Sequence, residues 1–551
     1  MTLRPWQKAC KEKALRWLLE TRTDRHFLVN AAPGAGKTLA ACSIAADLFS
    51  LGEIDRVIVI APRSAVVGKW ADDFRIVTGR YMQKVTESDG DISSLNLDVC
   101  ATWTAIQGLQ DALYEVCRQS RTLVICDEHH HAAVAAAWGD GANSAFALAR
   151  YVIVLTGTPI RSDGEASIWL AYDDRGQITQ PVDGTYTLSY GEAVDLGYCR
   201  PITFHRHYGQ FSVSLDASTT VDVTPDSQPF IDPKFRHIPA LQRALDFYKL
   251  ACTPQYEDDG VTPLVTGYQG SMVTCAAAKL DEVRHQIPNA GGLVIAQSIE
   301  LAEYFVKLIE KIEGERPVLV HSGMQNPERF INSFRNTDKR WLVSVAMVSE
   351  GVDIPRLRVM VYLPYALTEL AFRQAMGRIV RTTGHEDDSR GYAVVPALEI
   401  FDQHARKIES EMSPRARTPE ATPHKKKCPH CGSESVIGAT VCENCGYEFP
   451  ARPPRMISCG TCGAPNHPSA SNCTSCGHSL VQQFGLTLTE ALRRGAIVRG
   501  MQLEEVEVLE GEAMADKVRR QVLASGDQLL VQMLRSLPPE SWGRLASILH
   551  H

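Results

Sequence analysis

Residues 27–38 read FLVNAAPGAGKT, an apolar run followed by a glycine-containing loop that ends in Gly36, Lys37 and Thr38. The apolar run predicts a buried strand, and the segment Thr38 to Phe49 has the apolar spacing of a helix. In this context glycines let main-chain N–H groups close around phosphates, the helix N-terminus favours negative charge, Lys37 reaches the β/γ oxygens and Thr38 holds Mg²⁺. The alternative is an incidental glycine-rich turn, and Ala31 stands where such loops usually have their first glycine.

On both sides of this loop, short β-branched runs alternate with helical segments such as Ser64 to Phe74 and Leu301 to Glu310. The runs form two sets, Phe27–Val29, Val57–Ile60, Asp98–Cys100, Leu123–Cys126 and Tyr151–Leu155, then Leu293–Ala296, Val318–Val320, Leu342–Val345, Val359–Leu363 and Ala393–Val395. This alternation predicts an α/β fold with two tandem parallel-sheet domains, residues 1–200 and 201–405. Between about residues 160 and 290, aromatic and Thr-rich pieces predict turns and irregular strands instead.

The composition is that of a globular protein with neither a membrane span nor a signal peptide. The chain has 551 residues, enough for several domains, with 44% hydrophobic and 22% charged residues. The longest apolar run, Ala132 to Trp138, is far shorter than the roughly 18 residues of a membrane span, and the N-terminus lacks a signal-peptide pattern. We therefore expect a cytoplasmic protein with no membrane partner. The net charge of −7 means that any nucleic-acid binding must be local.

Two carboxylates follow the strand predicted at Leu123 to Cys126. Asp127 and Glu128 come directly after this strand, which places them beside the phosphate loop. There Asp127 can bind Mg²⁺, and Glu128 can position and deprotonate an attacking water. The neighbouring histidines 129–131 lack the HExxH spacing of a zinc protease, so we favour a role other than metal binding for them.

Seven motifs in order resemble those of the superfamily 2 helicases and translocases of the DEAD/DEAH kind, across about residues 1 to 400. They are RPWQ at 4–7, the loop at 31–38, APR at 61–63, DEHH at 127–130, TGTP at 156–159, SEGVDIP at 349–355 and QAMGRIVR at 374–381. The resemblance implies two RecA-like domains that close on ATP and Mg²⁺. The glycine at 157 departs from the more usual alanine of this motif.

The resemblance also implies roles for individual residues. Arg378 and Arg381, three apart on a predicted helix with Gln374 one turn earlier, would act as arginine fingers towards the nucleotide. Gln7 would read the adenine edge, which favours ATP over GTP. The other nucleotide-binding positions are Arg4, Pro33, Gly34, Ala35, Gly36, Gly351 and Asp353. The alternatives are a solvated arginine face and an ordinary glutamine at a helix start.

Contacts with nucleic acid, carried over from the same resemblance, fall on Pro62, Arg63, Thr102, Ser322 and Gly323. Such contacts would reach phosphates rather than bases. Taken alone, each of these residues is more typical of an ordinary turn or strand end than of a nucleic-acid contact.

Eight of the 16 cysteines lie between residues 428 and 476. Cys428, Cys431, Cys442 and Cys445 repeat the spacing of Cys459, Cys462, Cys473 and Cys476, each CxxC followed by glycine. This pattern predicts two closed structural Zn²⁺ sites in ribbons at 428–480. His430, His467 and His478 are spare candidates. A Ser/Pro/Lys-rich linker is expected at 406–427 and a mainly helical tail at 481–551.

Together these patterns predict a nucleic-acid-dependent ATPase, a DNA helicase or translocase acting in DNA repair or recombination. Single-stranded or branched DNA is the expected partner, RNA remains open, and the ribbons or the tail would bind other replication or repair proteins. The order of motor domains and ribbons looks like that of the bacterial RadD-type proteins. The rival hypotheses are a motor subunit of a restriction or antiphage system, and a zinc-ribbon binding module with a vestigial ATPase switch. The run Lys425 to Lys427 fits a phosphate contact or a solvated linker equally.

Overall fold

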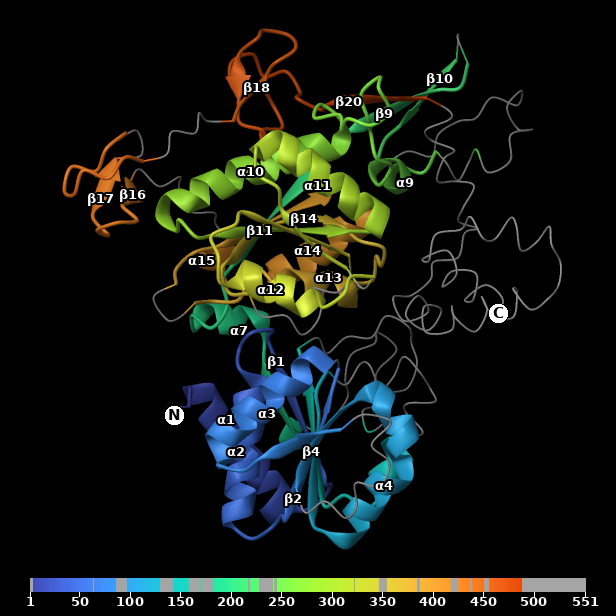
Figure 1. Ribbon diagram of the computed structural model, residues 1–551, viewed down its shortest axis with the longest axis vertical. Coiled ribbons are helices and arrows are strands. Elements are labelled where there is room, and N and C mark those ends of the chain that lie inside the picture. The colour runs from blue at the N-terminus through green and yellow to red at the C-terminus, as the bar shows by residue number, and fades with distance from the viewer. Residues whose placement is uncertain are drawn as a thin grey trace, which may run out of the picture.

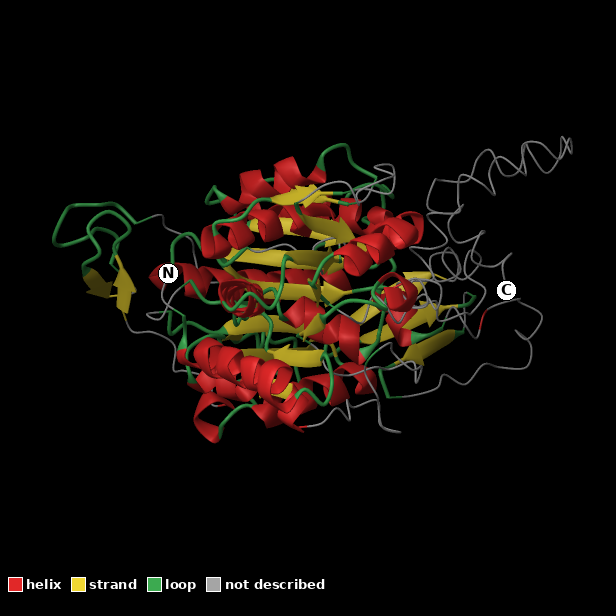
Figure 2. Ribbon diagram, turned by 90° about the horizontal axis from the view of Figure 1, so that it is seen from below, coloured by secondary structure: helices red, strands yellow, loops and turns green. Residues whose placement is uncertain are grey.

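The computed structural model contains two α/β domains, one above the other, and two small cysteine-containing modules beside the second domain (Figure 1). It describes residues 3–62, 64–85, 97–128, 142–157, 169, 182–216, 219–226, 241, 245–321, 323–345, 354–383, 387–417, 425–436, 439–449 and 455–487. Helices cover both faces of the strands (Figure 2).

The first domain is built on a parallel sheet with the order β3-β4-β2-β5-β6-β1-β7. Its strands are β1 (His26–Ala31), β2 (Arg56–Ala61), β3 (Met82–Lys84), β4 (Asp98–Thr102), β5 (Thr122–Cys126), β6 (Tyr151–Thr156) and β7 (Thr185–Leu188). Every residue of β2, β5 and β6 is buried, because helices cover both faces. The helices α1 (Pro5–Leu15), α2 (Lys37–Ser50) and α3 (Ser64–Thr78) pack on one face, and α4 (Ile106–Gln119) packs on the other.

The second domain repeats this architecture with a parallel sheet of order β12-β13-β11-β14-β15-β8. Its strands are β8 (Ile202–His207), β11 (Gly291–Ala296), β12 (Val318–Val320), β13 (Trp341–Val345), β14 (Leu357–Leu363) and β15 (Gly391–Pro396). The helices are α10 (Tyr268–Gln286), α11 (Ile299–Glu313), α12 (Pro327–Arg335), α13 (Glu369–Met376) and α14 (Glu399–Glu411). Each strand predicted from the sequence lies inside an observed strand, so the predicted tandem parallel sheets are confirmed.

The chain crosses from the first sheet to the second through α7 (Tyr190–Asp195) and the residues up to Pro201. This crossing lies next to the boundary predicted after residue 200. The segment predicted to be irregular contains β8, which completes the second sheet, and the 19-residue helix α10. The sequence of α10 shows little apolar periodicity because many of its buried residues are alanines and other small residues. These small residues let the helix pack closely on β11, β14 and β15.

A third, small sheet joins two distant parts of the chain. Strand β9 (Gln210–Ser214) lies between β10 (Thr220–Val223) and β20 (Gln483–Thr487). The prediction of a helical tail from residue 481 is wrong for residues 483–487, because alternate residues Phe484 and Leu486 are buried as one face of a strand. The helices predicted further along the tail lie outside the described residues.

The predicted linker, residues 406–427, contains the end of α14, the short helix α15 (Pro414–Arg417) and the strand β16 (Lys425–Lys427). Strand β16 pairs with β17 (Glu434–Val436) in the first cysteine module, and β18 (Ile457–Ser458) pairs with β19 (Pro465–Asn466) in the second. Within the described ranges, no helix has the length and apolar character needed to cross a bilayer.

Candidate functional site

The loop between β1 and α2 has the geometry of a phosphate cradle. Gly34 and Gly36 adopt φ angles of +80° and +98°, a left-handed conformation that side chains disfavour, and Gly36 is the residue before α2. The Lys37 ammonium donates to the Ala31 carbonyl oxygen at 3.0 Å, across the loop. The predicted strand, loop and helix are thus all present, and the positive end of the α2 dipole points into the loop.

Arg4 and Gln7 brace this loop from α1. The Gln7 amide donates to the Gly36 carbonyl oxygen at 2.9 Å and accepts from the Arg4 main-chain N–H at 2.8 Å, and the Arg4 guanidinium donates to the Ala35 carbonyl oxygen at 3.0 Å. Both ends of the buried Gln7 amide are therefore engaged by the protein. One N–H and one lone pair of this amide remain for an adenine contact.

Asp127 follows β5 directly and is held on three sides. Its main-chain N–H donates to the Ile60 carbonyl oxygen at 2.8 Å, the Trp70 indole donates to its carboxylate at 2.8 Å, and the Trp103 indole donates to its carbonyl oxygen at 3.1 Å. Burial and the nearby Glu128 raise the pKa of Asp127 above its ordinary value, whereas the Trp70 bond and Lys37 oppose this. Asp127 therefore lies within electrostatic reach of Lys37, as the sequence predicts.

Glu128 has a φ of +49°, unusual for a residue with a side chain. The chain thus turns sharply right after the aspartate. The adjacent histidines 129–131 lie outside the described residues.

The segment after α13 in the second domain packs against the phosphate loop. A Cβ placed on Gly34 would lie 2.9 Å from the Arg381 Cγ, and one placed on Gly377 would lie 2.9 Å from the Pro33 Cβ. Arg378 is only 7% exposed. Arg381 therefore lies in the contact between the domains, and Arg378 is buried rather than on a solvated face. Gln374 lies on α13 just before them.

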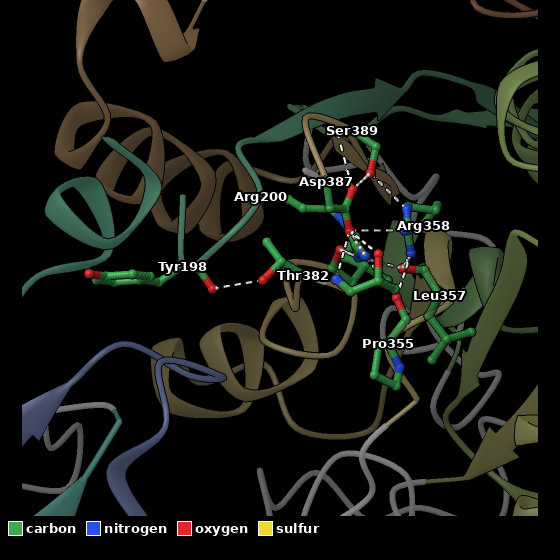
Figure 3. A network of polar contacts seen from close by, with 10 residues as sticks. Tyr198, Arg200, Pro355, Leu357, Arg358, Thr382, Asp387 and Ser389 are labelled. Atoms are coloured by element: carbon green, nitrogen blue, oxygen red, sulfur yellow. Dashed lines mark hydrogen bonds and ion pairs between the residues drawn. The ribbon is translucent and has the colours of Figure 1, made fainter. Parts of the chain in front are cut away.

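The connector Tyr198–Arg200, which follows α7, runs alongside this arginine segment (Figure 3). Cys199 and Arg381 form an antiparallel bridge, the Arg200 N–H donates to the Val380 carbonyl oxygen at 2.7 Å, and the Thr382 hydroxyl donates to the Tyr198 carbonyl oxygen at 3.3 Å. The connector thus fixes the backbone that carries Arg381.

A buried ionic network anchors the connector. The Asp387 carboxylate accepts from the Arg200 guanidinium at 2.6 and 3.0 Å and from Arg358 of β14 at 3.1 Å, and it also binds Thr383 and Ser389 (Figure 3). Burial alone would raise the pKa of Asp387, but the Arg200 hydrogen bond and the Arg358 charge outweigh it and hold that pKa well below the ordinary value. The Arg200 and Asp387 side chains are 0% and 4% exposed, so the pair is enclosed by the second domain.

The connector also touches the first domain. The Cys199 thiol donates to the Pro33 carbonyl oxygen at 3.2 Å, and the Arg4 guanidinium lies 4.6 Å from the centre of the Tyr198 ring. Burial raises the pKa of Cys199 to about 12, so the thiol stays protonated and able to donate. Sequence reasoning missed Trp70, Trp103 and the connector, because single residues of these types carry no motif.

Three of the residues predicted to contact nucleic acid are among the described residues, and they lie at the carboxyl ends of strands. Pro62 follows β2, Thr102 ends β4 opposite Ala61, and Gly323 follows β12. These are the carboxyl ends of parallel strands, where α/β proteins bind ligands. The other predicted positions Arg63, Ser322, Gly351, Asp353, Thr158 and Pro159 are outside the described residues. Gly157 leaves room for Lys37, whose Nζ would be 2.7 Å from a Cβ there.

Each of the two cysteine modules gathers four sulfur atoms. Within each set, Cys428, Cys431, Cys442 and Cys445 or Cys459, Cys462, Cys473 and Cys476, all Sγ atoms lie within 4.8 Å of one another. The closest pairs are 3.5 to 3.7 Å apart. Four thiolates around Zn²⁺ at about 2.3 Å require sulfur separations of roughly 3.8 Å, so both sets fit tetrahedral zinc.

All four CxxC knuckles have the same fold. The glycine after each pair donates its N–H to the carbonyl oxygen of the first cysteine at 2.8 to 2.9 Å, with φ between 70° and 73°. These glycines are Gly432, Gly446, Gly463 and Gly477. The glycine after each CxxC thus takes a left-handed conformation that closes the knuckle. His430, His467 and His478 are not among the clustered ligands.

Both modules pack against the second domain. In the first, Lys426 is buried, lies 3.8 Å from the centre of the Phe449 ring and belongs to β16, which packs against α10. In the second, Arg455 donates to Asp281 at 3.0 Å and to Glu313 at 2.9 Å. Of the Lys425–Lys427 run, Lys426 is thus structural, and Lys425 pairs with Glu434 at 3.0 Å.

The comparisons with known families match this arrangement in order. Residues 1–161 match the family model of the type III restriction enzyme res subunit, residues 276–383 match the helicase conserved C-terminal domain, and residues 428–477 match the double zinc ribbon. The chain thus contains a domain like that of restriction-enzyme res subunits, followed by a helicase C-terminal domain. The two cysteine modules are a double zinc ribbon.

Proteins of similar sequence occur in mycobacteria. The uncharacterized protein Rv2917 of Mycobacterium tuberculosis is 32% identical over 383 residues, which is 69% of this chain and 59% of that protein. The uncharacterized protein ML1624 of Mycobacterium leprae is 30% identical over 412 residues, 74% of this chain and 64% of that protein. The chain thus spans about three fifths of the length of these relatives. The helicase domain of Pyrococcus furiosus Hef has a TM-score of 0.43 and 16% identity, over 73% of this chain and 97% of that one.

Proposed function

We propose that this protein is a nucleic-acid-dependent ATPase that uses ATP hydrolysis between its two motor domains to move along or remodel DNA. The observation that carries the proposal is the packing of Arg381 on Gly34, which is so close that a Cβ added to Gly34 would lie 2.9 Å from the Arg381 Cγ. A loop that binds phosphates and a basic segment of the other domain meet there, so closure of the domains delivers positive charge to the nucleotide.

In this proposal the first domain holds the nucleotide. The loop residues Pro33, Gly34, Ala35 and Gly36 surround the phosphates, Lys37 binds the terminal phosphates, and Arg4 and Gln7 act on the base side. The hydroxyl of Thr38 and the carboxylate of Asp127 supply the oxygen ligands that Mg²⁺ prefers, and the ion would neutralise phosphate charge. Glu128 orients and deprotonates the attacking water.

The second domain completes the site. Arg378 and Arg381 stabilise the negative charge that develops on the transferred phosphoryl group, and Gln374 assists in positioning. The motif residues Gly351 and Asp353 would contact the nucleotide from the same side. The connector contacts Pro33 and Arg4, so it links the position of the second domain to that of the phosphate loop.

Nucleic acid would bind across the carboxyl ends of β2, β4 and β12, at Pro62, Arg63, Thr102, Ser322 and Gly323. DNA, single-stranded or branched, is our proposed substrate, with repair or recombination as its setting. The ribbons would contribute a further contact with DNA or with a replication or repair protein.

A second candidate function is supported by the first family match. The model that matches residues 1–161 describes the res subunit of type III restriction enzymes. The chain would then be the motor of a restriction or antiphage system, with its nuclease on another polypeptide. In that case, ATP turnover would respond to duplex DNA rather than to single-stranded or forked DNA.

The test measures ATP turnover alone and with single-stranded DNA, duplex DNA, forked DNA and RNA. We expect stimulation by DNA that disappears in Lys37→Ala and Glu128→Gln, by on the order of 100-fold or more. Lys11→Ala and Glu12→Gln on α1 are the matched controls and retain stimulation. Equal turnover with and without every polynucleotide would exclude the motor, and a strand-displacement assay then separates a helicase from a translocase.

A further inference from the structure

Two tryptophans donate hydrogen bonds to Asp127, and both follow strand ends that we propose bind nucleic acid. Trp70 belongs to α3, and Trp103 begins the short 3-10 helix Trp103–Ala105 that follows β4. Each side chain is only 1% exposed, so each indole is fixed by the packing around it.

The two indoles fix different parts of the same residue. The Trp70 N–H binds the Asp127 carboxylate at 2.8 Å, which selects the direction of that carboxylate. The Trp103 N–H binds the Asp127 carbonyl oxygen at 3.1 Å, which fixes the backbone where the chain turns towards Glu128. A movement of either indole must therefore move the carboxylate or the turn after it.

Each tryptophan also lies on an element that begins directly after a proposed nucleic-acid contact. Trp103 directly follows Thr102, and α3 begins right after Pro62 and Arg63. Trp70 lies fewer than two turns into α3, on the order of 10 Å from its first residue along the axis. Because Ala61 and Thr102 are paired in neighbouring strands, both elements start at one place on the sheet edge.

We infer that Trp70 and Trp103 are positioning residues that couple nucleic-acid binding to the magnesium carboxylate Asp127. A strand bound at Pro62 and Thr102 would shift the starts of α3 and of the 3-10 helix, and the indoles would carry that shift to Asp127. Packed helices move as rigid bodies, so a displacement at one end of α3 reaches Trp70 without loss. This inference rests on the proposed function.

The experiment compares Trp70→Phe and Trp103→Phe with the wild-type protein. Phenylalanine keeps a buried ring but removes the indole N–H. The readouts are the ratio of ATP turnover with and without single-stranded DNA, and the Mg²⁺ concentration that gives half-maximal turnover. We expect the ratio to fall about tenfold in Trp70→Phe, which loses a bond to a charged group, and about threefold in Trp103→Phe. The Mg²⁺ requirement rises in Trp70→Phe.

Trp17→Phe is the matched control, because the Trp17 indole donates to the His26 carbonyl oxygen at 2.8 Å in the same domain. It should leave both the ratio and the Mg²⁺ requirement unchanged. Thermal unfolding of each variant reports stability separately, and the two tryptophan variants test the coupling independently if one of them folds poorly.

A purely structural role would lower turnover with and without DNA by the same factor. An unchanged ratio and an unchanged Mg²⁺ requirement in both folded variants would therefore overturn the inference while the proposed function stands. A wild-type protein whose turnover ignores every nucleic acid would overturn the proposed function itself, and this inference with it.

Discussion

The sulfur atom of Cys199 lies 3.2 Å from the main-chain carbonyl oxygen of Pro33. The two residues belong to different parts of the motor, since Pro33 is in the phosphate loop and Cys199 is paired with Arg381 of the second domain. This contact exists only while the domains are together. The thiol is therefore a natural reporter of domain separation.

Alkylation of Cys199 should follow domain opening. We expect N-ethylmaleimide to modify Cys199 at least about tenfold faster than Cys126 of β5, because Cys199 needs only the domains to part, whereas Cys126 needs the first sheet to unfold. Mass spectrometry of both peptides after timed pulses measures the two rates. Equal rates would show that the Cys199 contact opens only with global unfolding.

Acid should weaken the anchor of the connector. The pKa of Asp387 is held below its unfolded value of about 4, so its contribution to stability is complete above that pH and is lost as the pH falls below it. Asp387→Asn should cost about 3–5 kcal/mol of unfolding free energy at pH 7, because Arg200 and Arg358 remain buried without their carboxylate. Urea unfolding from pH 7 to pH 3 measures both effects.

The control for this anchor is the neighbouring Asp388→Asn, since Asp388 is exposed. It should unfold like the wild-type protein at every pH. An Asp387→Asn variant whose stability falls in acid as steeply as that of the wild type would contradict the assignment.

Each set of four cysteines should bind one zinc ion. The purified protein should contain two zinc ions, and Cys431→Ser and Cys462→Ser should each leave about one, because each removes a ligand from a different closed site. Elemental analysis after dialysis gives the count. Cys10→Ser, a change in α1 outside both sets, should retain two, and loss of both ions in either ligand variant would mean that the sites are not independent.

Phe484 should be as important to the second domain as a residue of its own core. Its ring lies 5.7 Å from that of Phe211 and 5.3 Å from that of Tyr268, and it is 3% exposed. Phe484→Ala should cost about 3–5 kcal/mol. Chemical denaturation checks this value against Phe330→Ala, whose ring on α12 is 41% exposed and whose loss should be nearly neutral.

Elements whose local sequence pattern matches their burial could be predicted from the sequence. The strands β2, β5 and β11 are short, mainly apolar runs that are buried on both faces, so their composition predicts them. The phosphate loop and the CxxC knuckles were predictable because their chemistry demands particular residues at fixed spacing.

Long-range partners could not be predicted in the same way. Nothing local in Gln483–Thr487 indicates that it pairs with β9, and nothing around Trp70 indicates that its indole meets Asp127. The same holds for Arg200, whose side chain is bound by Asp387 and by the carbonyl oxygens of Pro355, Leu357 and Ile379. Such contacts depend on where the completed sheets place residues that are distant along the chain.

The parallel pairing of β20 with β9 has a consequence for synthesis of the protein. A ribosome releases β9 early, but its neighbour β20 emerges only after both ribbons have been made. Until then Phe211 and Tyr268 lack the aromatic ring that covers them. Nascent chains therefore reach their final packing late, and a stop codon placed just after the ribbons would leave the motor incomplete rather than merely shortened.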